Sequence, residues 1–346
     1  MRSIHNVLNT QYYKKSSWIL ILLPLSFIYF LIISFRSWAY KIGIFKSIKM
    51  DVPVVVIGNI TIGGTGKTPL VIWLLEKLIK LGMKPGLICS GYNSNAKSPQ
   101  EVFIDSEVSN VGDEALMIKL RFQEGNRNIP IFVGKKKAKV GKALLNSYPD
   151  VNILISDDGL QHYELARDFE IAVVDGDRGF GNRFLIPAGP LRECLTRINE
   201  VDALVLNGPT KKKRLHEKKD AVFQMRCSGD LFVNCLHSNR ISDPDTFERY
   251  IVAITGIGNP DRFIKHLKTL NLPPNNIKIF DDHHSFNESD FWAYDDHDLD
   301  IIMTEKDAVK CKDFAKENFW YLPIYADVEE ELFKKMIKKL RIKLNG

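Results

Sequence analysis

The chain has 346 residues, of which 45% are hydrophobic and 26% are charged, and its formal net charge is +6. This length allows a large buried core and favours two domains over one, and the hydrophobic content excludes a disordered chain. Residues 1–50 contain seven of the 48 Lys and Arg and none of the 42 Asp and Glu, so the rest of the chain is nearly neutral, with 41 basic and 42 acidic residues. Basic residues beside an apolar run suit anionic lipid head groups, and a neutral body argues against a nucleic-acid partner.

The first predicted element is an apolar helix near the N-terminus. Residues 17–34 carry no charge, and as a helix they measure about 27 Å, close to the ~30 Å of a bilayer core. Trp18 and Trp38 flank the run, as interfacial anchors do. Three interpretations stay open: a helix that spans the membrane, a monotopic or re-entrant helix broken at Pro24, and a signal peptide. The length of the run and the lack of a small-x-small cleavage site argue against a signal peptide.

The charges around this segment indicate its orientation. Four basic residues follow it within 15 positions and three precede it, so the positive-inside rule weakly favours a cytosolic body.

The body begins with a strand, a glycine loop and a helix. VVVIGN at 54–59 is β-branched and ends near glycines, and residues 69–82 place apolar side chains at helical spacing. Alternating strands and helices predict a doubly wound parallel sheet. The glycine loop between the first strand and the first helix makes this sheet P-loop NTPase-like. The lysine-rich stretch 211–219 is interpreted as a solvated loop. We expect the further strands at 86–89, 129–133, 151–156, 169–174 and 203–206, with helices at 113–122 and 136–145.

The pattern of strands and helices restarts after about residue 230. Strands expected at 250–255, 277–280, 300–304 and 319–325, with a helix at 260–270, predict a second, smaller α/β domain. We therefore expect a membrane anchor in residues 1–45, a P-loop core in 46–230 and the smaller domain in 231–346.

Residues 61–68 read TIGGTGKT and directly precede a predicted helix. Glycines let backbone N–H groups turn toward an anion, while Lys67 reaches the β- and γ-phosphates of ATP and Thr68 offers a hydroxyl to Mg²⁺. The strict pattern has a glycine where Thr61 stands, and the alternative is a structural turn. The predicted nucleotide-binding residues are Thr61, Ile62, Gly63, Gly64, Thr65, Gly66, Lys67 and Thr68.

A second motif, which is acidic, completes the predicted magnesium site. VNILISDD at 151–158 is a hydrophobic strand that ends in Asp157 and Asp158. Adjacent acids at a strand end are also common as solvated groups, but beside a P-loop they predict metal binding, because Mg²⁺ is held there by few carboxylates plus phosphate oxygens.

Seven motifs follow one another through most of the chain. They are VVVIGNITIGGTGKTP at 54–69, VGDEALM at 111–117, DDGLQHYELARDFEIAVVD at 157–175, FLIPAGPLRE at 184–193, AITGIGNPDRF at 253–263, DDHHSF at 281–286 and TEKDAVK at 304–310. In their order and number they resemble the tetraacyldisaccharide 4'-kinase (lipid A 4'-kinase) family.

The resemblance implies transfer of the γ-phosphate of ATP, with Mg²⁺, to the 4'-hydroxyl of a tetraacylated glucosamine disaccharide 1-phosphate in lipid A synthesis. The expected place is the inner membrane, with the catalytic body on the cytoplasmic side and a lipid-like disaccharide as the partner. We expect a monomer.

The resemblance also implies roles for individual residues. Asp113 and His283 match the family's catalytic dyad, in which Asp113 accepts the hydroxyl proton and His283 polarises it, with Lys67 at the phosphates. The other residues expected in the metal, nucleotide or acceptor region are Glu114, Asp157, Asp158, Gln161, His162 and Arg192.

Several positions stay open. Lys306 either contacts nucleotide or caps the next helix, and Arg192 and Arg197 pair either with the acceptor's 1-phosphate or with nearby glutamates. Ser90 and Lys137 stand where the family has arginines, and Lys137 keeps the charge but loses bidentate geometry.

Two other functions compete with the kinase. A membrane-associated P-loop ATPase or nucleotide switch would act on a protein partner and would need no base aimed at an acceptor. A non-catalytic membrane scaffold is less consistent with the intact Lys67, Thr68 and paired acids.

Overall fold

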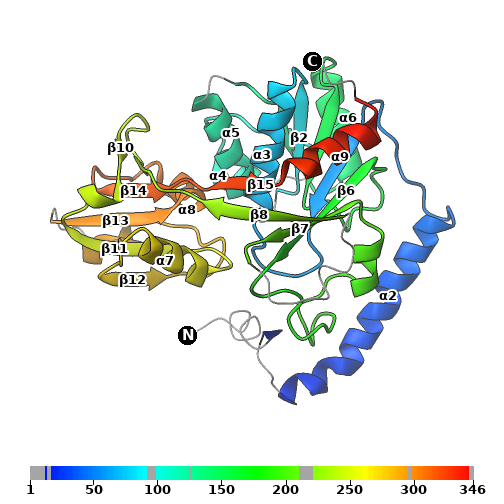
Figure 1. The fold of residues 1–346 in the computed structure, drawn as a ribbon, viewed down its shortest axis with the longest axis horizontal. Coiled ribbons are helices and arrows are strands. Elements are labelled where there is room, and N and C mark those ends of the chain that lie inside the picture. Colours follow the sequence, from blue (N-terminus) through cyan, green and yellow to red (C-terminus); the bar gives the residue numbers. More distant parts are fainter. Residues whose placement is uncertain are drawn as a thin grey trace.

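The computed structural model describes residues 12–13, 17–91, 99–124, 127–209, 221–294 and 298–342. Within these ranges the strands form two sheets, one of nine strands and one of six, which lie side by side in Figure 1. This agrees with the α/β class predicted from the sequence. Outside the described residues lie Arg2, Lys14, Lys15, Tyr92 and the predicted loop at 211–219.

The first sheet is parallel except at its two edges. Its order is β15-β8-β7-β6-β1-β5-β2-β4-β3, with β3 and β15 antiparallel to their neighbours. Strand β1 lies at the centre between β5 and β6, and all its residues are buried. The strands are β1 Val54–Gly58, β2 Pro85–Cys89, β3 Gln100–Glu101, β4 Ile131–Val133, β5 Ile153–Asp157, β6 Phe169–Asp175, β7 Ala203–Asn207, β8 Val222–Ser228 and β15 Tyr325–Val328.

Apolar clusters cover both faces of this sheet. Val55 and Ile57 pack in one cluster with side chains of α3, α5 and α9, while Val54 and Val56 pack in the other with α6. Side chains of a strand alternate between faces, so a strand buried on both sides needs the continuous apolar run that the sequence shows. The sheet is therefore doubly wound, as predicted. Its helices are α3 Lys67–Lys80, α4 Val108–Val111, α5 Asp113–Glu124, α6 Lys137–Ser147 and α9 Glu330–Leu340.

The second sheet has the order β10-β9-β14-β13-β11-β12, with β11 to β14 parallel and β9 and β10 antiparallel. Its two faces are covered by separate apolar clusters. Its elements are β9 Phe232–Asn234, β10 Ile241–Ser242, β11 Tyr250–Thr255, α7 Pro260–Thr269, β12 Asn276–Ile279, β13 Leu299–Thr304, α8 Glu305–Ala308 and β14 Phe319–Leu322. Short 3-10 helices lie between these elements at Pro244–Thr246, Glu288–Asp290, Trp292–Tyr294 and Val309–Cys311. Two others, Ser17–Leu22 and Leu195–Asn199, lie outside the second sheet.

Two chain segments connect the sheets, one after β8 and one between β14 and β15. The single strand expected at 319–325 is two strands in different sheets, separated by Pro323, which has no N–H for a ladder. The described second sheet thus covers residues 232–322, and β15 and α9 pack on the first sheet. The predicted division into three domains stays a prediction.

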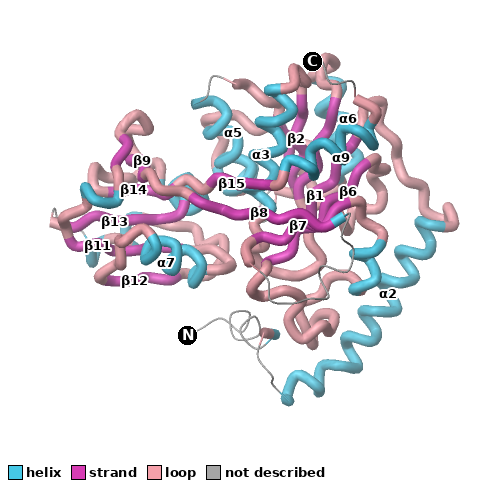
Figure 2. The backbone as a smooth tube through the Cα atoms, viewed as in Figure 1, coloured by secondary structure: helices cyan, strands magenta, loops and turns pink. Residues whose placement is uncertain are grey.

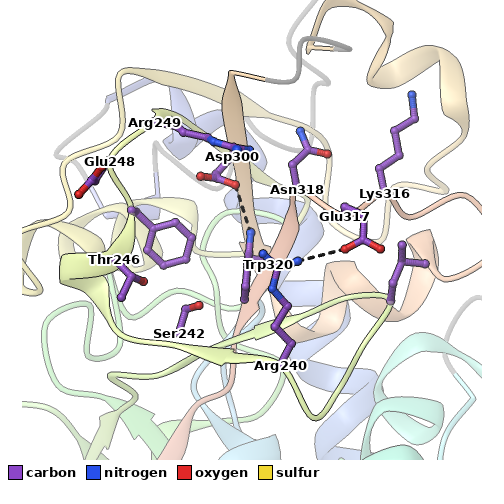
Figure 3. A pocket seen from close by; sticks show the side chains of 12 residues that line it. Arg240, Ser242, Thr246, Glu248, Arg249, Asp300, Lys316, Glu317, Asn318 and Trp320 are labelled. Atoms are coloured by element: carbon purple, nitrogen blue, oxygen red, sulfur yellow. Dashed lines mark hydrogen bonds and ion pairs between the residues drawn. The ribbon is translucent and has the colours of Figure 1, made fainter.

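A hollow of about 880 Å³ lies at the amino ends of the strands of the second sheet (Figure 3). The indole Nε1 of Trp320 donates to Asp300 at 3.2 Å, and Arg240 pairs with Glu317 at 3.0 Å. The opposite ends of these strands carry the motif residues described below, so this hollow is separate from them.

Helix α2, Leu23–Lys41, runs along the outside of the first sheet's domain in Figure 2. It is the one helix in the described part of the chain that is long and apolar enough to cross a membrane. One side is bound to the body: Ser26 donates to the carbonyl of Leu185 at 2.9 Å, and Tyr29 donates to the carbonyl of Arg192 at 2.9 Å. The opposite side is apolar and exposed, as at Leu25, Phe27, Ile28, Leu31, Ile32 and Phe35.

The connection between the sheets predicts the effect of Gly229→Ala. A Cβ at Gly229 would lie 2.1 Å from the backbone carbonyl oxygen of Pro323, and two backbone segments that connect the same sheets cannot separate freely. We expect a loss of about 1–3 kcal/mol in the free energy of unfolding, measured by thermal or urea denaturation. Ser228→Ala, at the exposed neighbouring position, is the control and should leave stability unchanged.

Candidate active site

The loop between β1 and α3 has the geometry that a phosphate-binding loop requires. Gly63 and Gly66 have φ angles of +92° and +87°, and α3 begins at Lys67, directly after Gly66. A Cβ at Gly66 would also lie 2.1 Å from Nδ2 of Asn207, so only glycine fits there. Glycines of this kind let backbone N–H groups turn toward an anion at the start of a helix.

The start of this loop is fixed by a neighbouring segment. Thr61 forms a β-bridge with Leu191, and the N–H of Ile62 donates to the carbonyl of Pro190 at 2.8 Å. Gly64 is open, since a Cβ there would meet no atom within 4 Å. Thr61, where the strict motif has glycine, is therefore held by a strand-like bridge.

The Lys67 side chain reaches the carboxyl ends of two neighbouring strands. Its ammonium lies 3.2 Å from Oδ1 of Asn59, which follows β1, and 3.2 Å from Oδ1 of Asp158, which follows β5. Thr68 lies in the first turn of α3 and is half-buried. Asn59 was not predicted as a site residue from the sequence. Its position directly after Gly58, at the carboxyl end of β1, is the feature that could have identified it.

Asp157 and Asp158 lie at the carboxyl end of β5, beside β1, as predicted. Nη1 of Arg192 donates to both carboxylate oxygens of Asp158, at 3.1 and 3.3 Å. Burial opposes ionisation of Asp158, but Lys67 and Arg192 outweigh it and hold its pKa well below the usual range. In contrast, burial and the negative charge of Glu114 raise the pKa of Asp157 to about 6.

The protein groups that fit a magnesium ion are few. In the part of the chain that the structure describes, no group of three or more His, Cys, Asp or Glu side chains is arranged to hold a metal. Asp157, Glu114 and the hydroxyl of Thr68 remain as donors, with Asp158 beside them. Glu114 raises the pKa of Asp157, and a divalent cation between the two carboxylates would remove that repulsion. The residues therefore fit Mg²⁺ that is bound together with ATP phosphates.

Asp113 and His283 meet although 170 positions separate them. Nδ1 of His283 lies 2.9 Å from Oδ2 of Asp113, the first residue of α5. Burial opposes the charge on Asp113, but the His283 hydrogen bond and Lys306 lower its pKa; the same hydrogen bond outweighs burial and raises the pKa of His283. His283 has a φ of +61°, and its N–H donates to the carbonyl of Gly256 at 3.1 Å.

Lys306 lies in the same cluster, and the sequence left its role open. Its ammonium is 3.2 Å from Oε1 of Glu114, 3.4 Å from Nε2 of His283 and 3.8 Å from Oδ2 of Asp113. The helix that follows β13 is capped by Thr304, whose Oγ1 accepts from the N–H of Asp307 at 3.2 Å, so Lys306 is not the cap. The sequence feature that points to a role in the site is the position of Lys306 at the carboxyl end of the parallel strand β13, because ligands bind at these ends in such sheets.

Charge and contact join this cluster to the phosphate loop. The charge of Glu114 raises the pKa of Asp157 and the charge of Lys67 lowers it, so both groups act electrostatically on this carboxylate. A Cβ at Gly258, in the loop after β11, would lie 3.2 Å from the backbone nitrogen of Gly64. The residues that the sequence assigns to two domains therefore surround one region.

The second sheet also supports the phosphate loop through a relay that the sequence did not reveal. Nη2 of Arg262, in α7, donates to Oδ1 of Asn207 at 2.6 Å, and Nδ2 of Asn207 donates to the carbonyl of Thr65 at 2.9 Å. Arg262 also lies 3.6 Å from Asp175. The conformation of the loop thus depends on a side chain from the second sheet.

The predicted acceptor residues lie beside this region. Nε2 of Gln161 donates to the carbonyl of Asn59 at 3.1 Å, and the carbonyl of Gln161 accepts from Arg36 of α2 at 2.9 Å. Burial, helped by the charge of Lys137, lowers the pKa of His162 to about 4, so this imidazole is neutral. These contacts place Gln161 between Asn59, at the end of β1, and α2.

The two arginines have different partners, and whether Arg192 contacts the acceptor stays a prediction. Arg192 pairs with Asp158, whereas Arg197 is buried and pairs with Glu170 and, at 3.7 Å, with Glu200. Lys137 is fully buried, and its ammonium donates to the carbonyls of Ile88 and Asp157 at 3.1 and 2.6 Å. Lys137 thus ties the ends of β2 and β5 together.

Comparison with known sequences gives one consistent result. The family described as tetraacyldisaccharide-1-P 4'-kinase matches residues 18–341. A tetraacyldisaccharide 4'-kinase of Methylobacillus flagellatus is 41% identical over 340 residues, which is 98% of this chain and 97% of the relative. One of Shewanella sediminis is 42% identical over 322 residues, covering 93% and 91% of the two chains.

A solved structure is similar over nearly the same length. It is the crystal structure of the "apo" form of LpxK from Aquifex aeolicus in complex with ATP, with a TM-score of 0.75 and 28% sequence identity. The match covers 93% of this chain and 99% of that one.

The loop geometry predicts the effect of Gly66→Ala on nucleotide affinity. A positive φ costs alanine about 1–2 kcal/mol in conformational free energy. The added Cβ would also clash with Asn207, which positions the loop. We expect ATP affinity, measured by fluorescence titration, to fall at least about tenfold. Gly82→Ala is the matched control, because Gly82 also has a positive φ but a Cβ there meets nothing within 4 Å. Equal nucleotide affinities for the two variants would contradict this role of Gly66.

Proposed function

The chain belongs to the tetraacyldisaccharide-1-P 4'-kinase family, and we infer that it is an ATP-dependent kinase that transfers the γ-phosphate of ATP to the 4'-hydroxyl of a tetraacyldisaccharide 1-phosphate in lipid A synthesis. One geometric observation supports this most strongly: Asp113 and His283 form a hydrogen-bonded pair, and Gly258 adjoins both Asp282, the neighbour of His283, and Gly64 of the phosphate loop. An ATPase or nucleotide switch would need no such pair directed at an acceptor.

We propose that Asp113 and His283 together take the proton of the attacking hydroxyl. Asp113 is ionised and accepts a hydrogen bond from Nδ1–H of His283, which fixes the orientation of the ring. Phosphoryl transfer depends mainly on alignment and charge stabilisation, and a positioned base contributes about 10²–10⁴-fold. The pair therefore orients the hydroxyl as well as removing its proton.

The remaining predicted residues divide between ATP and the lipid. We propose that residues 61–66 bind the phosphates through backbone N–H groups, with Lys67 at the β- and γ-phosphates. Thr68, Glu114, Asp157 and Asp158 would hold Mg²⁺, which neutralises phosphate charge when bound. Gln161, His162 and Arg192, which adjoin Asn59 and Asp158, are proposed to contact the sugar or its phosphate.

The membrane position follows from the two sides of α2. We propose that α2 lies in the plane of the cytoplasmic face of the inner membrane, because a helix that crossed the bilayer would lose its contacts with the body. These contacts extend from Ser26 to Lys41, which pairs with Glu200. The exposed apolar side would enter the bilayer beside anionic head groups, and this brings Gln161 and Arg192 close to the lipid acceptor. A monomer stays our prediction.

The kinase proposal predicts that Asp113→Asn strongly slows lipid phosphorylation. With γ-labelled ATP, Mg²⁺ and the tetraacyldisaccharide 1-phosphate, the wild type should transfer label to the lipid, and the variant should do so about 10²–10⁴-fold more slowly, because the proton acceptor is lost. Asp105→Asn, at an exposed acid upstream of α5, should retain full activity. Label that appears only in free phosphate would favour the ATPase.

The membrane proposal predicts that Ile28→Glu combined with Ile32→Glu weakens binding to vesicles that contain phosphatidylglycerol. Both side chains are more than half exposed, at 54% and 60%, so the fold should remain stable while cosedimentation falls at least about tenfold. Ile277→Glu with Ile279→Glu, exposed on the edge strand β12, is the matched control and should bind like the wild type. Wild-type protein that resists an alkaline carbonate wash would contradict the in-plane position and favour a spanning helix.

A further inference from the structure

Lys306 is a buried cation in the middle of the site. Its side chain is 16% exposed, and its ammonium meets Glu114 at 3.2 Å, His283 Nε2 at 3.4 Å and Asp282 at 3.6 Å. Burial works against its charge, but Glu114, Asp113 and Asp282 outweigh burial and raise its pKa above the usual range. The carboxylates of Glu114, Asp282 and Asp113, at 3.2, 3.6 and 3.8 Å from the ammonium, favour the charged form that a lysine has at neutral pH.

The partners of Lys306 come from both sheets. Glu114 and Asp113 begin α5, which packs on the first sheet, whereas Asp282 and His283 follow β12 of the second. Lys306 itself follows β13. Its ammonium thus lies between the pair that would receive the hydroxyl proton and the carboxylate that would hold the metal.

The chemistry of phosphoryl transfer defines what must lie in this position. The attacking oxygen, the phosphorus and the leaving oxygen are roughly in line. If the hydroxyl is held by Asp113 and His283 and the metal by Glu114, the transferred group passes between them. The ammonium of Lys306 reaches the same space.

We propose that Lys306 contacts the γ-phosphoryl group during its transfer and is a catalytic residue of the reaction; this rests on the proposed kinase function. The bond between the γ-phosphorus and the oxygen that bridges it to the β-phosphate breaks, and ADP leaves with the electron pair. The bond from the sugar oxygen to the γ-phosphorus forms, and the hydroxyl proton passes to the Asp113–His283 pair. Lys306 remains protonated and donates hydrogen bonds to the equatorial oxygens, whose negative charge it stabilises.

A purely structural role makes a different prediction. As an ion pair between sheets, Lys306 would hold α5 against the turn after β12 whichever nucleotide was bound. As a phosphate ligand, it distinguishes ATP from ADP, because only ATP has a γ-phosphate. The local fold has other supports, since the buried Asp307 accepts from Thr255, Thr304 and the N–H of Gly256.

The test compares Lys306→Met and Lys306→Arg with Lys265→Met, a control at an exposed position on α7. For Lys306→Met we expect kcat for lipid phosphorylation to fall on the order of 10²–10³-fold, with KM for the lipid changed only a few-fold. Affinity for the β,γ-imido analogue of ATP should fall about tenfold while ADP affinity stays unchanged. Lys306→Arg should recover part of the kcat and the preference for the ATP analogue, and Lys265→Met should match the wild type.

Two outcomes would overturn the role of Lys306. One is wild-type kcat in Lys306→Met, and the other is an equal loss of affinity for the ATP analogue and ADP together with a lower melting temperature, which is the signature of an ion pair alone. If Lys306→Met does not fold, Lys306→Arg decides, because a folded variant without preference for the ATP analogue over ADP rejects the proposal. Failure of the kinase function itself is distinguishable, since the wild type would then label no lipid, whereas the nucleotide comparison needs no lipid.

Discussion

The hydrogen bond between Asp113 and His283 is the contact on which the rest of the site depends. It joins the start of α5 to the turn after β12, at 2.9 Å, across the boundary between two sheets. A buried carboxylate is stable only with a partner, and the left-handed backbone of His283 is held by the carbonyl of Gly256. The proposed base can therefore form only when both sheets are folded and in this relative position.

The other charges are arranged around this bond. Lys67 reaches Asp158 from the first sheet, and Lys306 reaches Glu114 from the second, so each lysine neutralises carboxylates that would otherwise repel one another. In the proposed mechanism, ATP phosphates would attract the lysines and a divalent cation would attract the carboxylates. The contact of Arg262 with Asn207 adds a direct mechanical link between the second sheet and the phosphate loop.

The features that the sequence predicted correctly are those encoded locally. The run VVVIGN and the glycines before Lys67 specify a buried strand, a turn and a helix within 27 residues, and the structure has them at Val54–Gly58 and Lys67–Lys80. Lys67, Thr68 and the paired acids were identified from local motifs, whereas Asp113 and His283 were predicted as a pair from the family resemblance. The fold adds their hydrogen bond of 2.9 Å and the neighbours that surround it. The roles assigned to them remain predictions.

The features that could not be predicted depend on contacts between distant residues. Hydropathy identifies α2 but does not reveal that Tyr29 donates to the carbonyl of Arg192, 163 positions away. The break between β14 and β15 separates strands that join different sheets, and Lys306 gains its significance only from partners on α5 and beyond β12. In each case the local sequence allows several arrangements, and long-range packing selects one.

The most direct test of the central claim is a double-mutant cycle on lipid phosphorylation with Asp113→Asn, His283→Gln and both changes together. If the two side chains act as one proton-accepting unit, each single variant and the double variant should lose nearly the same activity, so that the effects are strongly non-additive. Losses that simply multiply, with unchanged ATP affinity in all three variants, would show that the two residues act independently and would contradict the account.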